Sequence, residues 1–174
     1  MKLTNNMQKF ILHWGEMGTR WGVNRTVAQI HALLYLSPEP LTAEIITETL
    51  GVARSNVSTS LKELQNWGLV KVVHVMGDRR DHFESIKDLW EMFTVILEER
   101  KRREIDPTLT LLRDCVMDND KETPKEINDR MAHMLEFMQT MSDWYDQMQT
   151  VPKPVLIKLM KLGSKVTGFF GKKN

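Results

Sequence analysis

Cysteine is nearly absent from this chain of 174 residues, which carries only Cys115. A single thiol excludes an intramolecular disulfide and suits a reducing cytoplasm. Long apolar runs are missing as well, because no stretch approaches the roughly 20 apolar residues of a membrane-spanning helix. The segment "MKLTNNMQKFILHWGEMG" has neither the uninterrupted apolar region nor the cleavage site of a secretion signal. These absences predict a cytoplasmic protein that does not bind a membrane.

The residue patterns of enzymes and metal sites are also missing. The histidines are scattered, and they form neither an HxxxH motif nor a Cys/His ligand pattern. Cys115 lies on an apolar stripe with Leu111 and Leu112, which predicts a small core residue rather than a redox sensor. We therefore predict that the protein is not an enzyme and has no catalytic residue, metal site or cofactor.

A strong net charge is the third missing feature, since 24 basic and 23 acidic residues leave a formal charge of +1. A total near zero does not mark a nucleic-acid binder, so any such interpretation must rest on local charge. The charge is unevenly spread: residues 114–148 hold nine acidic and three basic residues, and six lysines without an acid follow from 153 onward. The length suits one domain, or a small domain with a helical extension.

What the chain does contain is a succession of helical patterns. Apolar residues at helical spacing predict a first helix over 6–20, although Gly15, Gly18 and Gly22 each cost up to about 1 kcal/mol inside a helix. Glycines on successive turns indicate that another backbone approaches closely. Asn24 and Thr42 stand where they would cap a second and a third helix, and Gly51 would close the third.

A fourth helix is predicted over 53–66, with Val57, Leu61 and Leu64 forming its buried stripe. After it the runs "VKVVHVM" and "HFESI" are β-like, and "GDRRD" at 77–81 predicts a hairpin turn between them. Helix, helix, turn, helix and hairpin is the order of a winged helix-turn-helix module. We therefore predict a mainly α (α+β) fold: a winged helix-turn-helix DNA-binding domain with a two-stranded wing, plus a helical dimerisation region.

The C-terminal half is predicted to be helical. Asp106–Pro107 would start a short helix, and Thr123–Glu126 matches a capping box. The last segment, 155–170, is a basic amphipathic helix, and its apolar face suits a dimer contact better than a membrane surface. In the helix that would start at Thr123–Glu126, apolar residues repeat with the spacing of a coiled-coil seam over about three heptads. They are Ile127, Met131, Met134, Met138, Met141, Tyr145 and Met148.

Polar side chains occupy the outward positions of the helix over 53–66. They can bind phosphates and base edges in a major groove, although any solvated helix face has a similar composition. Two arginines at the hairpin tip have no structural use there, whereas a wing that enters a minor groove does use them. Asp78 favours a turn and could orient an arginine, and Thr42 could contribute a backbone contact to a phosphate at a helix start. The residues predicted to bind DNA are Thr42, Arg54, Ser55, Asn56, Ser58, Thr59, Lys62, Arg79 and Arg80.

The order "LTAEIITETLGV", "SNVSTSLKELQNWGLV" and "VVHVMGDRRDHF" resembles the MarR superfamily of winged-helix regulators, including its wing Asp-x-Arg at Asp78 and Arg80. The segment "WGEMGTRWGVNRTVAQIHALLYLSPEPLTAEII" is similar to the GbsR-like branch of that superfamily. The resemblance covers residues 8–105. It implies a homodimeric transcriptional regulator, more often a repressor than an activator, on a pseudo-palindromic operator in double-stranded DNA. Ala53 departs from the pattern, because many relatives have a capping serine there.

Two groups of residues could bind a small ligand. The methionines of the heptad stripe could line an adaptable pocket, but a core or a dimer seam explains them more simply. Aromatic residues could form a cage for a quaternary ammonium effector, although core packing explains each of them separately. The resemblance to the GbsR-like branch, which is associated with osmoprotectant genes, favours such an effector. The candidate cage residues are Trp14, Trp21, Trp90, Trp144 and Tyr145.

These observations divide the chain by function. Residues 1–86 are predicted to form the DNA-binding domain, and residues 87–174 a helical region for dimerisation and effector sensing. The alternative is a non-enzymatic protein-interaction module that recruits partners through its winged helix and its heptad-patterned helix. The salt dependence of DNA binding separates the two hypotheses.

Overall fold

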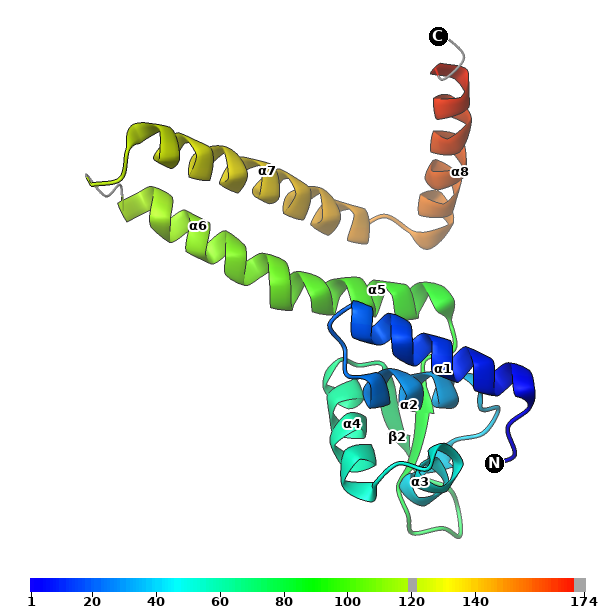
Figure 1. Cartoon of the computed structure of the whole chain (residues 1–174). Coiled ribbons are helices and arrows are strands. Elements are labelled where there is room, and N and C mark those ends of the chain that lie inside the picture. The colour runs from blue at the N-terminus through cyan, green and yellow to red at the C-terminus, as the bar shows by residue number, and fades with distance from the viewer. Residues whose placement is uncertain (119–121, 171–174) are drawn as a thin grey trace. The chain divides into compact units, whose positions relative to one another are not determined.

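The computed structural model describes residues 1–118 and 122–170, with side chains described up to residue 162. The chain divides into two compact units, Met1–Glu99 and Arg100–Asn174. Helices dominate both units, and a three-stranded antiparallel sheet lies in the first (Figure 1). The predicted fold class is confirmed: a mainly helical protein with a winged helix-turn-helix domain. No helix among the described residues is long and apolar enough to cross a membrane.

Side-chain caps set the starts of the first two helices. α1 spans Asn5–Arg20, and the hydroxyl of Thr4 accepts a hydrogen bond from its first turn. α2 spans Arg25–Leu36, and the side chain of Asn24 accepts from the backbone N–H of Thr26 at 2.8 Å. The predicted cap at Asn24 is therefore confirmed. It satisfies one of the backbone donors that a helix start leaves unpaired.

Two glycines allow α1 and α2 to pack closely. A Cβ atom on Gly18 would lie 2.5 Å from the Cβ atom of Ala28. A Cβ atom on Gly15 would lie 2.7 Å from the Cγ atom of Gln29. Real carbon atoms do not approach so closely, so a side chain at either position would force a neighbour to move. The predicted close approach is confirmed at Gly15 and Gly18. It is wrong at Gly22, where a Cβ atom would meet nothing within 4 Å.

The core of the first unit forms around α2. The helix-turn-helix consists of α3 (Ala43–Leu50) and α4 (Arg54–Asn66), with Gly51 in the left-handed conformation (φ 63°) between them. The predicted stripes of α2 and α4 are buried, and they meet in one cluster with Ile46 of α3. Its members include Val27, Ile30, Leu33, Leu34, Ile46, Val57, Leu61 and Leu64.

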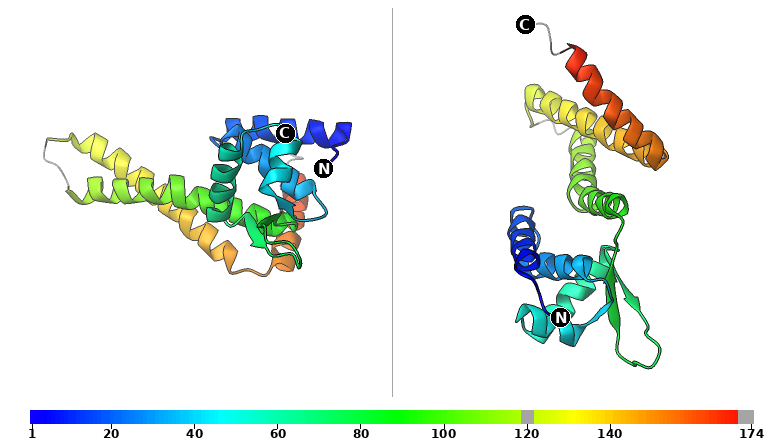
Figure 2. Two further views of the ribbon diagram at one scale, coloured as in Figure 1. Left: turned by 90° about the horizontal axis from the view of Figure 1, so that it is seen from below. Right: turned by 90° about the vertical axis from the view of Figure 1, so that its right-hand side faces the viewer.

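The sheet contains one strand more than the sequence predicts. β2 (Val70–Val73) and β3 (His82–Ser85) form the predicted hairpin, with Val70 opposite Ser85. The short strand β1 (Leu41–Thr42) pairs with the other edge of β3, so the strand order is β1-β3-β2. β2 ends at Val73, so the loop of the hairpin spans 74–81 and is longer than the predicted turn at 77–81. Figure 2 shows this loop projecting beyond the helices of the first unit.

A continuous helical segment leads from one unit into the other. α5 (Leu89–Arg100) passes into the π-helical turn η1 (Lys101–Ile105) and then into α6 (Asp106–Asp118). α6 begins at Asp106, as predicted from Asp106–Pro107, but Asp106 has helical backbone angles directly after η1, so the prediction that it caps the helix is wrong. Proline inside an α-helix removes one backbone hydrogen bond and clashes with the preceding turn. The π turn directly before Pro107 changes the hydrogen-bond register at this position.

In the second unit, α6 and α7 (Lys125–Gln149) run antiparallel and pack together, and α8 (Lys153–Phe170) follows (Figure 1). Pro124, and not Thr123, is the N-cap residue of α7, so the predicted capping box at Thr123–Glu126 is wrong. A proline directly before the helix leaves Thr123 one position too early to act as the cap. Of the lysines predicted to share a face of the last helix, the side chain of Lys165 lies outside the described residues.

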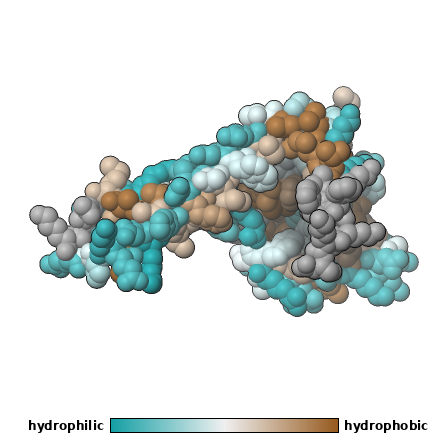
Figure 3. All heavy atoms as spheres, turned by 90° about the horizontal axis from the view of Figure 1, so that it is seen from above, coloured by the Kyte–Doolittle hydropathy of each residue, from teal (hydrophilic) through white to brown (hydrophobic). Residues whose placement is uncertain are grey.

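The heptad stripe of α7 is only partly covered within one chain. Ile127, Met134 and Met141 are 43%, 56% and 49% exposed, whereas Met131 and Met138 are half-buried. Phe137 and Trp144 are exposed beside the stripe. Figure 3 shows brown and tan spheres among the polar ones along the segment formed by α6 and α7.

Candidate nucleic-acid interface

The structure confirms that α4 turns its polar row outward. All six of the residues concerned are exposed, whereas Val57, Leu61 and Leu64 are at most 2% exposed. Successive residues of an α-helix are separated by about 100°. This spacing places the following residues at the centre of the outward face: Ser55, Ser58, Thr59 and Lys62.

The same spacing places Arg54 and Asn56 at opposite edges of this face. Arg54 forms an ion pair with Glu44 of α3, with its Nη2 atom 2.9 Å from Oε1. Ala53 precedes α4 without a capping side chain, so the first backbone N–H groups of α4 have no side-chain acceptor from that residue. Free N–H groups at a helix start favour anions such as phosphate. Although Ala53 replaces the capping serine of many relatives, α4 is helical from Arg54 onward.

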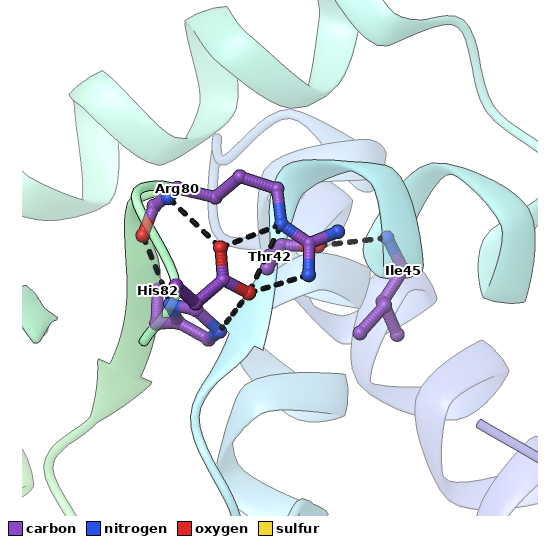
Figure 4. A network of polar contacts seen from close by, with 5 residues as sticks. Thr42, Ile45, Arg80 and His82 are labelled. Carbon is purple, nitrogen blue, oxygen red and sulfur yellow. Dashed lines mark hydrogen bonds and ion pairs between the residues drawn. The ribbon is translucent and has the colours of Figure 1, made fainter. Parts of the chain in front are cut away.

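The wing loop is built around the carboxylate of Asp78. One of its oxygens accepts from the backbone N–H of Arg80 at 3.0 Å and from the Nε atom of Arg80 at 2.9 Å. The other accepts from Nη2 of the same guanidinium, so the pair is bidentate (Figure 4). Both predicted roles of Asp78, turn formation and orientation of an arginine, are confirmed. The hydrogen bonds from Arg80 hold the pKa of Asp78 well below its usual range, and Asp78 raises the pKa of Arg80.

His82 belongs to the same network, although the sequence analysis did not assign it there. Its Nδ1 atom lies 3.0 Å from the carbonyl oxygen of Arg80, and its Nε2 atom lies 3.6 Å from Asp78. The ring is buried at the start of β3, beneath the loop. The spacing Asp-x-Arg-x-His is the sequence signal that could have found it. Together these contacts fix Arg80, whereas Arg79 is exposed at the loop surface.

The guanidinium of Arg80 extends toward the first turn of α3, where Thr42 and Ile45 lie (Figure 4). Glu44 stands in that turn, and its carboxylate interacts electrostatically with both Arg80 and Arg54. Its pKa is lowered, first by its own backbone N–H and then by Thr42 and the two arginines. The wing, the first turn of α3 and the start of α4 therefore meet at one end of the first unit.

Thr42 is the one predicted DNA contact whose side chain is buried. It is 0% exposed, and its hydroxyl accepts from the backbone N–H of Ile45 at 3.4 Å to cap α3. The side chain of Thr42 therefore serves as the cap of α3. The contact predicted for Thr42 is one from its backbone to a phosphate, and it stays a prediction.

The predicted aromatic cage is distributed over both units. Trp14 and Trp21 are brought together, with ring centroids 6.3 Å apart, and Phe10 stacks on Trp14 at 5.6 Å. Trp90 packs on Phe93 at 6.1 Å. Trp144 and Tyr145 belong to the second unit. Core packing of α1 thus explains Trp14, whereas Trp21 is 48% exposed.

No group of three or more potential metal ligands occurs among the residues that the structure describes. Cys115 is half-buried on α6 and is therefore less buried than the predicted core residue, since Leu112 of its stripe is buried but Leu111 is 62% exposed.

Comparison with known proteins gives a consistent result. Residues 21–81 match the model of the MarR family. The chain is 24% identical over 140 residues to the HTH-type transcriptional repressor GbsR of Bacillus subtilis (strain 168), with 78% of this chain and 77% of the relative covered. It is 20% identical over 141 residues to the putative HTH-type transcriptional regulator YvaV of the same organism, with 79% and 80% covered.

One solved structure, titled as a transcriptional regulator, superposes with a TM-score of 0.67 at 19% identity and covers 82% of this chain and 94% of its own. It shows the same fold. The matched segment, residues 21–81, holds α2, α3, α4 and the loop of the wing. Through this winged-helix segment, residues 21–81, the chain is similar to the MarR family.

Proposed function

We propose that the protein is a sequence-specific DNA-binding transcriptional regulator, acting as a repressor. The observation that carries the proposal is the meeting of three elements at one end of the first unit. The exposed polar row of α4 lies there together with a wing arginine that Asp78 holds in place. Such an arrangement suits a helix in the major groove and an arginine in the adjacent minor groove.

The experiment is a binding titration of the full chain against two kinds of duplex at several salt concentrations. One duplex has a mixed sequence, and the other is selected from a random pool for binding. For a DNA binder the logarithm of the association constant falls linearly with the logarithm of salt, by about 0.9 for each phosphate neutralised. Binding that is insensitive to salt, or no preference for the selected duplex, contradicts the proposal. The protein-interaction module would then be the better hypothesis.

The proposal includes a homodimer on a pseudo-palindromic operator, with DNA binding assigned to residues 1–86 and dimerisation to 87–174. The exposed apolar residues of α7 support it, because large apolar side chains at helical spacing are the usual mark of an interface. Met134, Phe137, Met141 and Trp144 follow this spacing and are 56%, 66%, 49% and 55% exposed.

Phe137→Glu places a charge within this apolar row, and Glu136→Gln changes a charge beside it. Light scattering should find the wild type and Glu136→Gln dimeric at micromolar concentration and Phe137→Glu shifted toward monomer. A monomeric wild type that binds its selected duplex fully would contradict the dimer.

An effector is the least constrained part of the proposal. The exposed edge of Trp21 against Trp14 supports a partial aromatic face of the kind that binds quaternary ammonium ions. Such an ion regulates only if it binds the DNA-competent and incompetent states unequally. Calorimetry with a choline-like cation at millimolar concentration tests this, with Trp21→Ala expected to weaken the binding and Trp67→Ala to leave it unchanged. Absence of binding removes the effector and leaves the regulator intact.

A further inference from the structure

Glu44 is a carboxylate between two arginines that we assign to DNA. It lies in the first turn of α3, is half-buried, and pairs with Arg54 of α4 at 2.9 Å. Its charge also acts on Arg80 of the wing. Glu44 therefore contacts α4 directly and acts on the wing through its charge.

Glu44 differs in kind from Asp78, the other acid at this end of the unit. Asp78 lies two residues from Arg80 and accepts four hydrogen bonds from its backbone and guanidinium, so it sets the shape of the loop. Glu44 comes from another helix, ten positions before Arg54, and holds a side chain that is 75% exposed. Because Arg54 is so exposed, a phosphate, which carries a higher charge, can replace Glu44 as its acceptor.

We propose that Glu44 restrains DNA binding by competing with phosphate for Arg54 and Arg80. The inference rests on the proposed function. A phosphate that approaches either arginine must displace the carboxylate or lie close to its negative charge. Either alternative reduces the gain in affinity from the two cations, and it reduces the number of counterions released on binding.

The test compares Glu44→Gln with Glu48→Gln. Glu48 is an exposed acid one turn further along α3, so it provides the same loss of charge on the same helix. Affinities for the mixed-sequence duplex are measured by fluorescence anisotropy at several salt concentrations. Glu44→Gln should raise the affinity about 2- to 5-fold, the range for an exposed ion pair. It should also steepen the salt dependence by up to about one unit of slope. Glu48→Gln should do less in both respects.

Two further variants exclude a merely structural effect. Glu44→Asp keeps the charge and should stay close to the wild type. Glu44→Gln in an Arg54→Ala background should gain less affinity than in the wild type, because part of its effect passes through Arg54. Thermal unfolding of each variant is recorded as well. Because damage to α3 would lower the affinity for DNA, a higher affinity of Glu44→Gln cannot result from such damage.

Equal gains for Glu44→Gln and Glu48→Gln would overturn the inference, as would a loss of affinity in Glu44→Gln. In both cases a wild type with salt-dependent binding would leave the proposed function standing. A wild type that does not bind duplex DNA would overturn both.

Discussion

The Nζ atom of Lys87 lies 2.7 Å from the carbonyl oxygen of Leu34, in the last turn of α2. The same ammonium donates to the carbonyls of Tyr35 at 2.9 Å and Ser37 at 2.6 Å. The last carbonyls of a helix have no partner within the helix and carry partial negative charge, so a cation stabilises them. Lys87 lies between β3 and α5. Its hydrogen bonds therefore connect the segment after the wing to α2, the central helix of the first unit.

We expect Lys87→Met to lower the free energy of unfolding by about 1–3 kcal/mol, since it removes a charged donor from three carbonyls at the end of α2, two of them in part-buried contacts. Lys71→Met is the matched control. Lys71 forms an exposed pair with Glu84 at 3.4 Å, and such pairs contribute less than about 1 kcal/mol. Urea denaturation at neutral pH measures both variants. Equal losses would mean that the contacts of Lys87 do not stabilise α2.

Gly18→Ala should be destabilising, although alanine is the better helix former by about 1 kcal/mol. The new Cβ atom would lie 2.5 Å from the Cβ atom of Ala28, so the two helices must separate. We expect a net loss of about 1–3 kcal/mol, as in other overpacked cores. Gly15→Ala meets the flexible side chain of Gln29 instead and should cost less. Thermal unfolding measures both variants. A lower stability of Gly15→Ala than of Gly18→Ala would contradict the expectation.

The stability of the first unit should fall in mildly acidic solution because of His31. Burial, followed by the charge of Lys87, lowers the pKa of His31 from 6.5 to about 4. Between these pH values the unfolded chain binds a proton that the folded chain does not. The contribution of His31 to the free energy of unfolding is therefore fully present above pH 6.5 and is lost as the pH falls toward about 4. It amounts to on the order of 3 kcal/mol.

His31→Leu should remove this component of the pH dependence, and the exposed His13→Leu should retain it. The Nε2 atom of His31 has no hydrogen-bond partner among the described residues, so leucine leaves no acceptor or donor unpaired. Urea midpoints from pH 7 to pH 4 give the measurement. Parallel curves for the wild type and His31→Leu would show that His31 is not the group concerned.

On DNA, the wing should act through charge rather than sequence. Arg80→Ala should weaken operator and mixed duplexes together and make the salt dependence shallower by up to about one unit of slope. Asp78→Asn keeps the charge of Arg80 but loses its bidentate partner, so affinity should fall less and the slope should stay nearly unchanged. Anisotropy titrations at several salt concentrations compare them. A selective loss on the operator alone would assign Arg80 to base recognition instead.

The outward face of α4 should carry the sequence information. Asn56→Ala should cost about 1–3 kcal/mol at the base pair that Asn56 prefers and change binding to mixed duplex little. Lys62→Ala, on the same face, should weaken all duplexes alike if it contacts phosphate. Operators with single base changes provide the readout. Unchanged operator affinity in both variants would leave the row as a solvated helix face.

The amino-acid sequence by itself determined the local elements of the DNA-binding unit. Asn24 and Thr42 cap their helices as predicted, and the stripe of Val57, Leu61 and Leu64 is buried. These features follow from the periodicity of a helix and from contacts two to four residues apart. The orientation of Arg80 by Asp78 is of the same kind, because the two residues lie within one loop.

Other features were decided only by the tertiary structure. The pairing of β1 with β3, the contacts of Lys87 with α2, and the ion pair between Glu44 and Arg54 join segments that are distant in the chain. Each depends on how the packed core places its elements, which residue spacing does not report. Packing likewise decided that the side chain of Thr42 is buried and that η1 runs directly into α6, so Asp106 is not a separate cap. Local signals define an element, whereas packing against the rest of the core decides where it ends and which of its side chains remain accessible.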